Sequence, residues 1–255
     1  MLESQQKLPI IATFMQVLIV MKERYIYFIK FSIPIFVFVG LAYIFQSSLM
    51  PSSIPNSPEP SRLLFFIFWL LGFFTITMVI VAYHRTFIMN IEDVEKTGIF
   101  RLGSREWRFI GWYFAMSFFI GIIVAVVMYA SIGFLKEGNV QTARIITFAI
   151  MIPIFYLSAH WLLVLPASSV DDSEASLSYA WDISQGNGWR IAVLVFGIPS
   201  AVNTLNLYVF SYNYMILTIL GVIISLFAMV LGIGVISLSY SYLKLNSKQT
   251  PTIEA

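Results

Sequence analysis

The sequence has 255 residues, of which 59% are hydrophobic and only 11% are charged. A soluble domain has roughly a quarter of its residues charged, so this composition excludes an ordinary water-soluble domain. The net charge of +2 is too small to indicate a nucleic-acid partner, and the absence of cysteine excludes disulfides and thiolate metal sites. Lipid is therefore the expected solvent for most of the chain.

The residues before the first long apolar stretch have the pattern of a helix in the lipid headgroup layer. Apolar side chains recur there at helical spacing, namely Ile10, Phe14, Val17, Leu18 and Met21. Basic residues flank this row on both sides, as is typical of helices that lie on a membrane. The alternative is a continuous extension of the first membrane span into the cytoplasm.

Six stretches are long and apolar enough to cross a bilayer, which takes about 20 residues at roughly 1.5 Å each. In chain order they are Tyr25–Leu49, Leu63–Tyr83, Phe109–Phe134, Ala143–Leu165, Trp189–Phe210 and Tyr214–Leu243. The pattern predicts an all-α fold, a polytopic helix bundle over residues 1–243 built from three consecutive two-span hairpins. A disordered cytoplasmic tail is expected over 244–255.

Lysine and arginine are distributed unevenly between the two sides that six spans create. Twelve of the 15 fall on the side of the termini and of two polar segments, 85–108 and 166–188. The other side has three, together with a proline-rich stretch over 47–61 that is expected to be a loop. Because cytoplasmic loops carry the positive excess, both termini and the two polar segments are predicted to be cytoplasmic. In a bacterium the proline-rich stretch would then face the periplasm.

Small residues repeat on one face of two predicted spans. The third span has Ser117, Gly121 and Ala125, and the sixth has Gly221, Ser225, Ala228 and Gly232. Because small residues let helices approach closely in lipid, both rows are predicted to be packing seams inside the bundle. A homodimer or another membrane-protein interface is the alternative.

The polar segment between spans four and five is predicted to hold a second helix on the inner leaflet, over 174–185. Asp171 and Asp172 precede it, where acidic residues would cap the helix and complement its dipole. Trp181 and Trp189 bracket the segment, and tryptophan favours the headgroup level. A soluble connector is the alternative.

Basic and aromatic side chains gather at the expected cytoplasmic ends of the spans. They are His84, Arg85, Arg101, Arg105, Arg108, His160, Trp189 and Arg190. Such clusters bind anionic lipid headgroups, so these residues form the predicted headgroup site and membrane lipids are the predicted partner. The alternative is the ordinary basic bias of an inner membrane face.

The sequence has no recognisable catalytic or cofactor-binding motif. It lacks a His-Glu-x-x-His pair, a Gly-x-Ser-x-Gly turn, a phosphate loop and a dinucleotide fingerprint. We therefore predict that the protein is not an enzyme and holds no cofactor or metal.

Several motifs together resemble a group of bacterial proteins. A span ending in Leu165-Pro166-Ala167, a short helix with the pair Ala180-Trp181, and 186–190 (Gly-Asn-Gly-Trp-Arg) opening the next span are similar to uncharacterised inner-membrane proteins of the YciC-like type. They also resemble the membrane domain attached to some glycerophosphodiester phosphodiesterases, as do 83–85 and 100–109. The resemblance covers about half the chain and departs at His160, where the pattern often has arginine.

This resemblance implies a six-span bacterial inner-membrane protein but no activity, because the phosphodiesterase chemistry resides in a separate soluble domain. The leading hypothesis is a non-catalytic protein that acts through lipid or protein contacts at the cytoplasmic leaflet. One alternative is a transporter or flippase-like protein for a lipid or small amphiphile, with a polar cavity between His160 and Thr75 or Thr77. The other alternative is an accessory subunit of a larger membrane complex.

Overall fold

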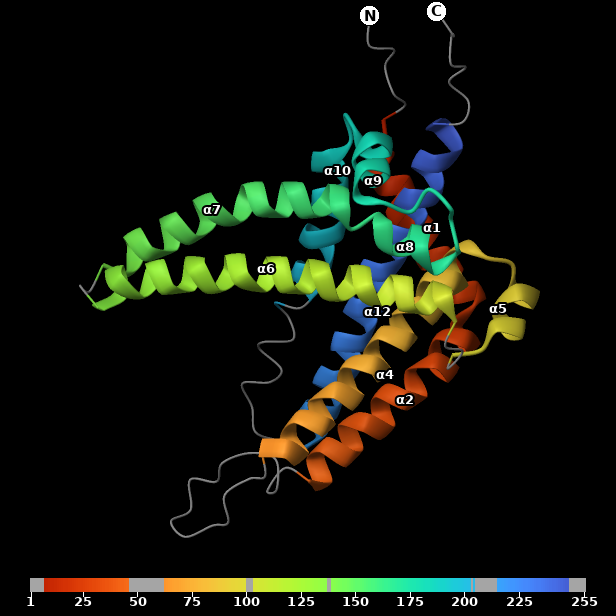
Figure 1. Ribbon diagram of the computed structural model, residues 1–255, viewed down its shortest axis with the longest axis horizontal. Coiled ribbons are helices and arrows are strands. Elements are labelled where there is room, and N and C mark those ends of the chain that lie inside the picture. Colours follow the sequence, from red (N-terminus) through yellow and green to blue (C-terminus); the bar gives the residue numbers. More distant parts are fainter. Residues whose placement is uncertain are drawn as a thin grey trace, which may run out of the picture.

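Two helical arms diverge from one shared end of the molecule (Figure 1). The computed structural model describes residues 7–45, 62–99, 103–136, 139–202, 204 and 215–247, and every regular element in these ranges is a helix. The first arm consists of α2 (Tyr25–Ile44), α4 (Arg62–Ile88) and α12 (Met215–Ser247). The second arm consists of α6 (Ser104–Lys136) and α7 (Val140–Trp161).

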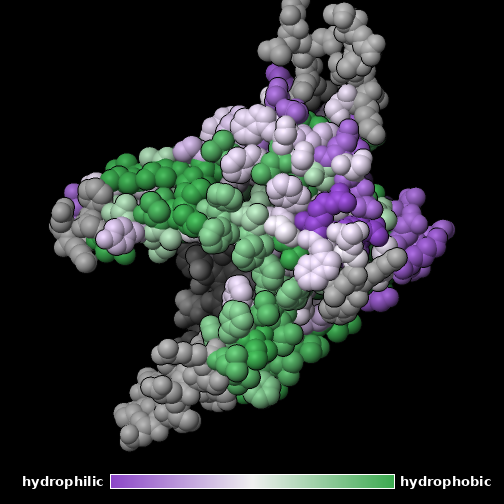
Figure 2. Space-filling view, viewed as in Figure 1, coloured by the Kyte–Doolittle hydropathy of each residue, from purple (hydrophilic) through white to green (hydrophobic). Residues whose placement is uncertain are grey.

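Short helices fill the shared end. They are α1 (Ile10–Glu23), α5 (Ile91–Thr97), α8 (Val164–Ser169), α9 (Leu177–Ser184) and α10 (Gly188–Ala192). We call these helices, with the ends of the long helices that meet them, the hub. Figure 2 shows hydrophilic side chains gathered over the hub and hydrophobic ones covering both arms.

Five helical stretches are long and apolar enough to cross a membrane, so the chain is a polytopic membrane protein by helix length and hydropathy. They are Tyr25–Ala42, Leu63–Ile88, Ser104–Ile132, Val140–Ser169 and Leu220–Ser247, and they confirm five of the predicted spans. The remaining predicted span corresponds to a shorter apolar helix, Gly188–Val202, and its continuation over 205–210 lies outside the described residues.

The shorter apolar helix contains a π-helical turn, Val193–Gly197, just before Pro199. Proline has no N–H, and its ring clashes with the carbonyl four residues earlier; a widened turn accommodates such a break. A Cβ added to Gly232 of α12 would lie 3.5 Å from Pro199 Cγ. Gly232 therefore packs against the shorter apolar helix, and Ala228 is buried as well, which agrees with the predicted packing seam at this part of α12.

The small residues of α6 behave differently. Ser117, Gly121 and Ala125 are all exposed, and a Cβ on Gly121 would meet nothing within 4 Å. The prediction of an internal packing seam is wrong here, because α7 and α8 contact other faces of α6. Among the described residues, this row therefore lies on the outer surface of α6.

α1 is a separate helix and no extension of the first span, since Arg24 interrupts the chain between α1 and α2. Val17 and Val20 of α1 are buried, and α1 lies against α12, where a Cβ on Gly234 would be 2.8 Å from Val17 Cγ1. The opposite side of α1 carries exposed apolar residues, namely Ile11, Met15 and Ile19. The segment is thus a helix, as predicted, but the row predicted to face lipid packs against the core instead, and a different apolar row faces outward.

Two predicted segments lie largely outside the described residues. The proline-rich stretch over 47–61 is one of them. The predicted tail is the other: α12 continues to Ser247, and 248–255 are not described.

Candidate functional site

A buried ion pair joins the two arms inside the hub. Arg85 of α4 and Glu106 of α6 are each 1% exposed, and the guanidinium Nη2 donates to Glu106 Oε1. Arg85 Nε also donates to the carbonyl of Ser169 in α8, at 3.0 Å. Glu106 Oε2 accepts from the N–H of Gly103, at 2.9 Å, at the start of α6. Since a buried charge is stable only with such partners, the pair fixes α4, α6 and α8 together.

His84, the neighbour of Arg85, connects α4 to α12. Its Nδ1 lies 2.7 Å from Ser237 Oγ, and its ring centroid is 5.7 Å from that of Phe109. The Ser237 hydroxyl donates to the carbonyl of Ile233, so its oxygen accepts from Nδ1–H. His84 is 1% exposed and therefore serves the packing between these helices.

His160 lies where α7, α9 and α10 meet. Its Nδ1 lies 2.5 Å from Ser184 Oγ, and its ring centroid is 4.3 Å from that of Trp181 and 4.9 Å from that of Tyr156. A Cβ on Gly188 would be 2.2 Å from His160 Nε2. The ring is thus enclosed by three helices. The polar cavity suggested between His160 and Thr75 or Thr77 is not seen among the described residues: His160 contacts Ser184, and the Thr77 hydroxyl donates to the carbonyl of Phe73 in its own helix.

Asp172 ties the segment after α8 to the end of α12. Its Oδ2 accepts from Lys244 Nζ, at 2.5 Å, and from the Tyr240 hydroxyl. The predicted capping role of the acidic pair is wrong, because α9 begins at Leu177 with Ser176 as its N-cap. The Ser176 hydroxyl accepts from the N–H of Tyr179, which leaves the carboxylate of Asp172 for its charged partner.

The pKa of Asp172 is below its ordinary value. Burial alone would raise this pKa, but the hydrogen bonds from Lys244 and Tyr240 outweigh burial. On the facing helix α9, burial and then the nearby carboxylates of Asp172 and Glu174 raise the pKa of Tyr179 to about 12. The ionised carboxylate of Asp172 is therefore the form that the fold favours.

The contribution of Asp172 to stability is expected to depend on pH. A carboxyl with a lowered pKa in the fold stabilises it fully above the unfolded value of about 3.9 and loses that effect as pH falls through the folded value. At pH 7 Asp172→Asn should cost about 1.5–3 kcal/mol, the range for charged hydrogen bonds. The difference between the melting temperatures of the two proteins in detergent, measured from about pH 7 down to pH 3, should be constant at the upper end and become smaller below about pH 4. Parallel curves would contradict this role.

Arg105 and Arg108 occupy the first turns of α6, at the surface of the hub. Arg108 Nη2 lies 3.4 Å from Asp171 Oδ1, and the two side chains are 40% and 54% exposed. Arg105 Nε lies 3.7 Å from Glu106 Oε1. Between them, Trp107 is 54% exposed. These are looser, more open contacts than those of Arg85.

The start of α10 holds the N-terminal segment in place. Arg190 Nη1 donates to the carbonyl of Leu8, at 2.8 Å, and the N–H of Leu8 donates to Asn187 Oδ1, at 2.7 Å. Trp189 is 57% exposed, and its ring centroid is 4.9 Å from that of Tyr156. This corner of the hub thus combines a buried anchor with an exposed indole.

The predicted headgroup residues fall into three places and form no single open cluster. His84 and Arg85 are inside the hub; Arg105 and Arg108 are on the start of α6; His160, Trp189 and Arg190 are at the α7, α9 and α10 junction. Arg101 lies outside the described residues. Because His84, Arg85 and His160 are buried, Arg105, Arg108, Trp189 and Arg190 are the ones that reach the hub surface.

The partners of these residues were not predicted from the sequence. Glu106 follows Gly103 by three positions, the spacing of a capping carboxylate, and this signal could have placed it. Arg24 Nη1 donates to the carbonyls of Thr86 and Met89 and so caps the end of α4. No local pattern connects Ser184 to His160 or Lys244 to Asp172.

Within the described residues, no group of three histidine, cysteine or acidic side chains could hold a metal ion. Comparison with family models, with curated proteins and with solved structures found no match to this chain.

Proposed function

We propose that the chain crosses a bacterial inner membrane six times, with the hub in the cytoplasm, and acts there by contacting lipid without catalysing a reaction. The observation that carries this proposal is the outward face of the hub. Trp107 and Trp189, both more than half exposed, stand in the first turns of two apolar helices, and Arg105 and Arg108 accompany the first of them. Indole and guanidinium groups at the cytoplasmic interface of a membrane favour contact with anionic lipid headgroups.

The position of the chain ends supports an even number of crossings. The Tyr242 hydroxyl lies 3.5 Å from the carbonyl of Lys7, so both described ends belong to the hub. The helix Gly188–Val202 begins in the hub and runs beside α12, and α12 returns to the hub at its C-terminal end. This helix would thus begin the fifth crossing, and α12 would complete the sixth.

The buried charged side chains that the structure describes are all paired with other helices, which favours a role without catalysis. Arg85, Glu106 and Asp172 each hold structural partners from other helices. A reacting group needs access to a substrate, and these groups are committed to holding the hub together.

Cysteine labelling tests the orientation, because the chain has no cysteine of its own. Ser104→Cys and Ser247→Cys place a thiol in the hub, and Val140→Cys places one at the far end of the second arm; all three positions are exposed. In intact spheroplasts a membrane-impermeant maleimide should label only the cysteine at 140. Labelling at 104 or 247 before permeabilisation would overturn the proposed topology.

Native mass spectrometry tests the lipid contact. Protein extracted in mild detergent should retain phosphatidylglycerol in preference to phosphatidylcholine, because the former is anionic. Equal retention of the two lipids, or retention of neither, would end the proposal of headgroup contact.

A further inference from the structure

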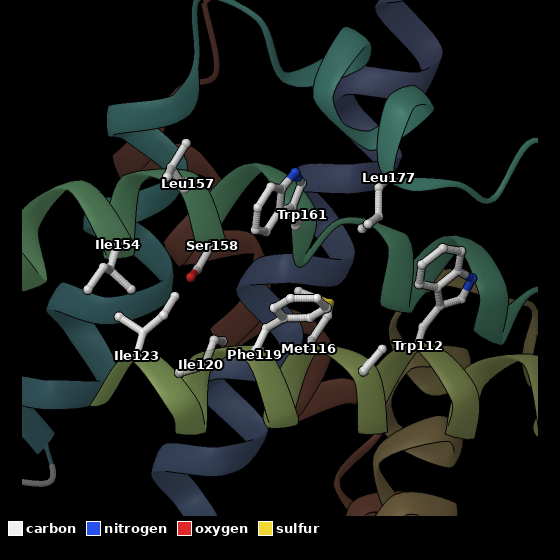
Figure 3. Close-up of a pocket in the computed structure, with 11 residues that line it drawn as sticks. Trp112, Met116, Phe119, Ile120, Ile123, Ile154, Leu157, Ser158, Trp161 and Leu177 are labelled. Carbon is white, nitrogen blue, oxygen red and sulfur yellow. The ribbon is translucent and has the colours of Figure 1, made fainter. Parts of the chain in front are cut away.

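An apolar pocket of about 260 Å³ lies between the two helices of the second arm, below the start of α9 (Figure 3). α6 supplies Met116 and Phe119, and α7 supplies Ile154 and Trp161. Leu177 of α9 closes the pocket toward the hub. Pockets for drug-sized molecules are roughly 300–1,000 Å³, so this one has room for part of an apolar chain.

The α6 wall of the pocket continues directly into the basic start of the helix. Trp112, Ala115 and Phe119 line the pocket, and Arg108 lies four residues before Trp112, on the same face of α6. Arg105 lies one turn earlier and borders this face. A molecule lying along α6 would therefore have its apolar part between α6 and α7 and its polar end beside two guanidinium groups.

The charge of Arg108 is accessible to such a molecule. Its contacts with Asp171 Oδ1 and with the carbonyl of Asp172 are both 3.4 Å long, near the limit for a hydrogen bond. Both ionic side chains of this pair are substantially exposed, unlike Arg85 with Glu106. A phosphate, which arginine binds in a bidentate manner, would compete with Asp171 for the same guanidinium.

We infer that this groove binds one anionic phospholipid of the cytoplasmic leaflet, with an acyl chain in the pocket and its phosphate at Arg108 and Arg105. The inference rests on the proposed function, because it needs the hub at the level of the inner headgroups. Beyond the proposed function, the inference specifies one binding site and a carboxylate, Asp171, that competes with the lipid phosphate. General contact with headgroups would require neither.

Four variants test the site, with retained phosphatidylglycerol and phosphatidylcholine counted by native mass spectrometry of the full chain. Ala115→Trp fills the pocket, and Ala125→Trp adds the same side chain to an exposed position of the same helix. Arg108→Gln removes the phosphate ligand. Asp171→Asn removes the competing charge and suits the left-handed backbone there, with φ of 60°.

Ala115→Trp should abolish the preferential retention of phosphatidylglycerol, and Ala125→Trp should leave it unchanged. Arg108→Gln should lower phosphatidylglycerol retention about fivefold, the factor expected for one basic residue at a lipid surface, with no change for phosphatidylcholine. Asp171→Asn should raise phosphatidylglycerol retention, which a purely structural Arg108–Asp171 pair would not do.

The inference is overturned if both tryptophan variants retain phosphatidylglycerol equally, or if Asp171→Asn retains no more than the wild-type protein. Should Ala115→Trp prevent folding, Arg108→Gln and Asp171→Asn decide between the outcomes on their own. If the wild-type protein retains phosphatidylglycerol but all four variants match it, the pocket is wrong and general headgroup contact stands. If the wild-type protein shows no preference, the proposed function fails as well.

Discussion

Glu106→Gln is expected to lower the free energy of unfolding by about 3–5 kcal/mol, the usual cost of breaking a buried ion pair from one side. The amide keeps the shape of the side chain but removes its charge. Arg85, 1% exposed, would then be a cation in the interior without its anionic partner. Because this pair connects α4 to α6, its loss should also make the orientation of one arm relative to the other less fixed. Titration with SDS in mixed micelles would measure the change.

Two further variants isolate the charge. Glu92→Gln alters an exposed glutamate of α5 and should cost less than about 0.5 kcal/mol, as surface changes usually do. The double variant Arg85→Met with Glu106→Leu should recover much of the loss, because apolar replacement of a whole buried pair is often neutral. A Glu106→Gln protein as stable as Glu92→Gln would show that the pair contributes little.

Gly188→Ala is expected to be the most damaging methyl addition in the hub. The new Cβ would lie 2.2 Å from His160 Nε2 and 2.6 Å from Tyr156 Cε2. His160 cannot easily withdraw, because Ser184 holds its Nδ1 and Trp181 lies against its ring. Overpacking of this kind costs about 1–3 kcal/mol or more. The melting temperature in detergent should fall accordingly.

A matched control is Gly111→Ala in α6, where a Cβ would meet nothing within 4 Å. This change should leave the melting temperature unchanged or raise it, since alanine favours helix more than glycine does. Removing the imidazole should also make room for the methyl group, so His160→Ala combined with Gly188→Ala should cost less than the sum of the single changes. Strict additivity of the two would refute the close contact.

Hydropathy was sufficient to predict the long helices. The predicted start at Tyr25 is the start of α2, and the predicted spans that begin at Leu63 and Tyr214 coincide with most of the described length of α4 and α12. The reason is that a membrane span is a one-dimensional signal, a run of apolar residues of fixed minimum length. At the hub ends the helices extend past the apolar run, as α6 does from Phe109 back to Ser104.

The hub could not be predicted in the same way, because its contacts join residues far apart in the sequence. Arg85 and His84 have the same appearance as any basic group at a membrane surface, yet they contact α6 and α12. Asp171 and Asp172 have the pattern of a helix start, but a lysine 72 residues later holds the second of them. The local preference of an acidic residue for a helix start is overridden here by a charged partner that comes close only in the folded chain.

The unequal lengths of the helices bear on where the hub would lie relative to a bilayer. α6 and α12 have 33 residues each, or about 50 Å, whereas α2 has 20 residues, or about 30 Å, which matches the hydrocarbon thickness alone. The surplus of α12 over α2 and the basic first turns of α6 fall on the same side. In the proposed topology, Arg85 and Glu106 would therefore lie toward the cytoplasmic ends of their helices, inside the protein interior of the hub.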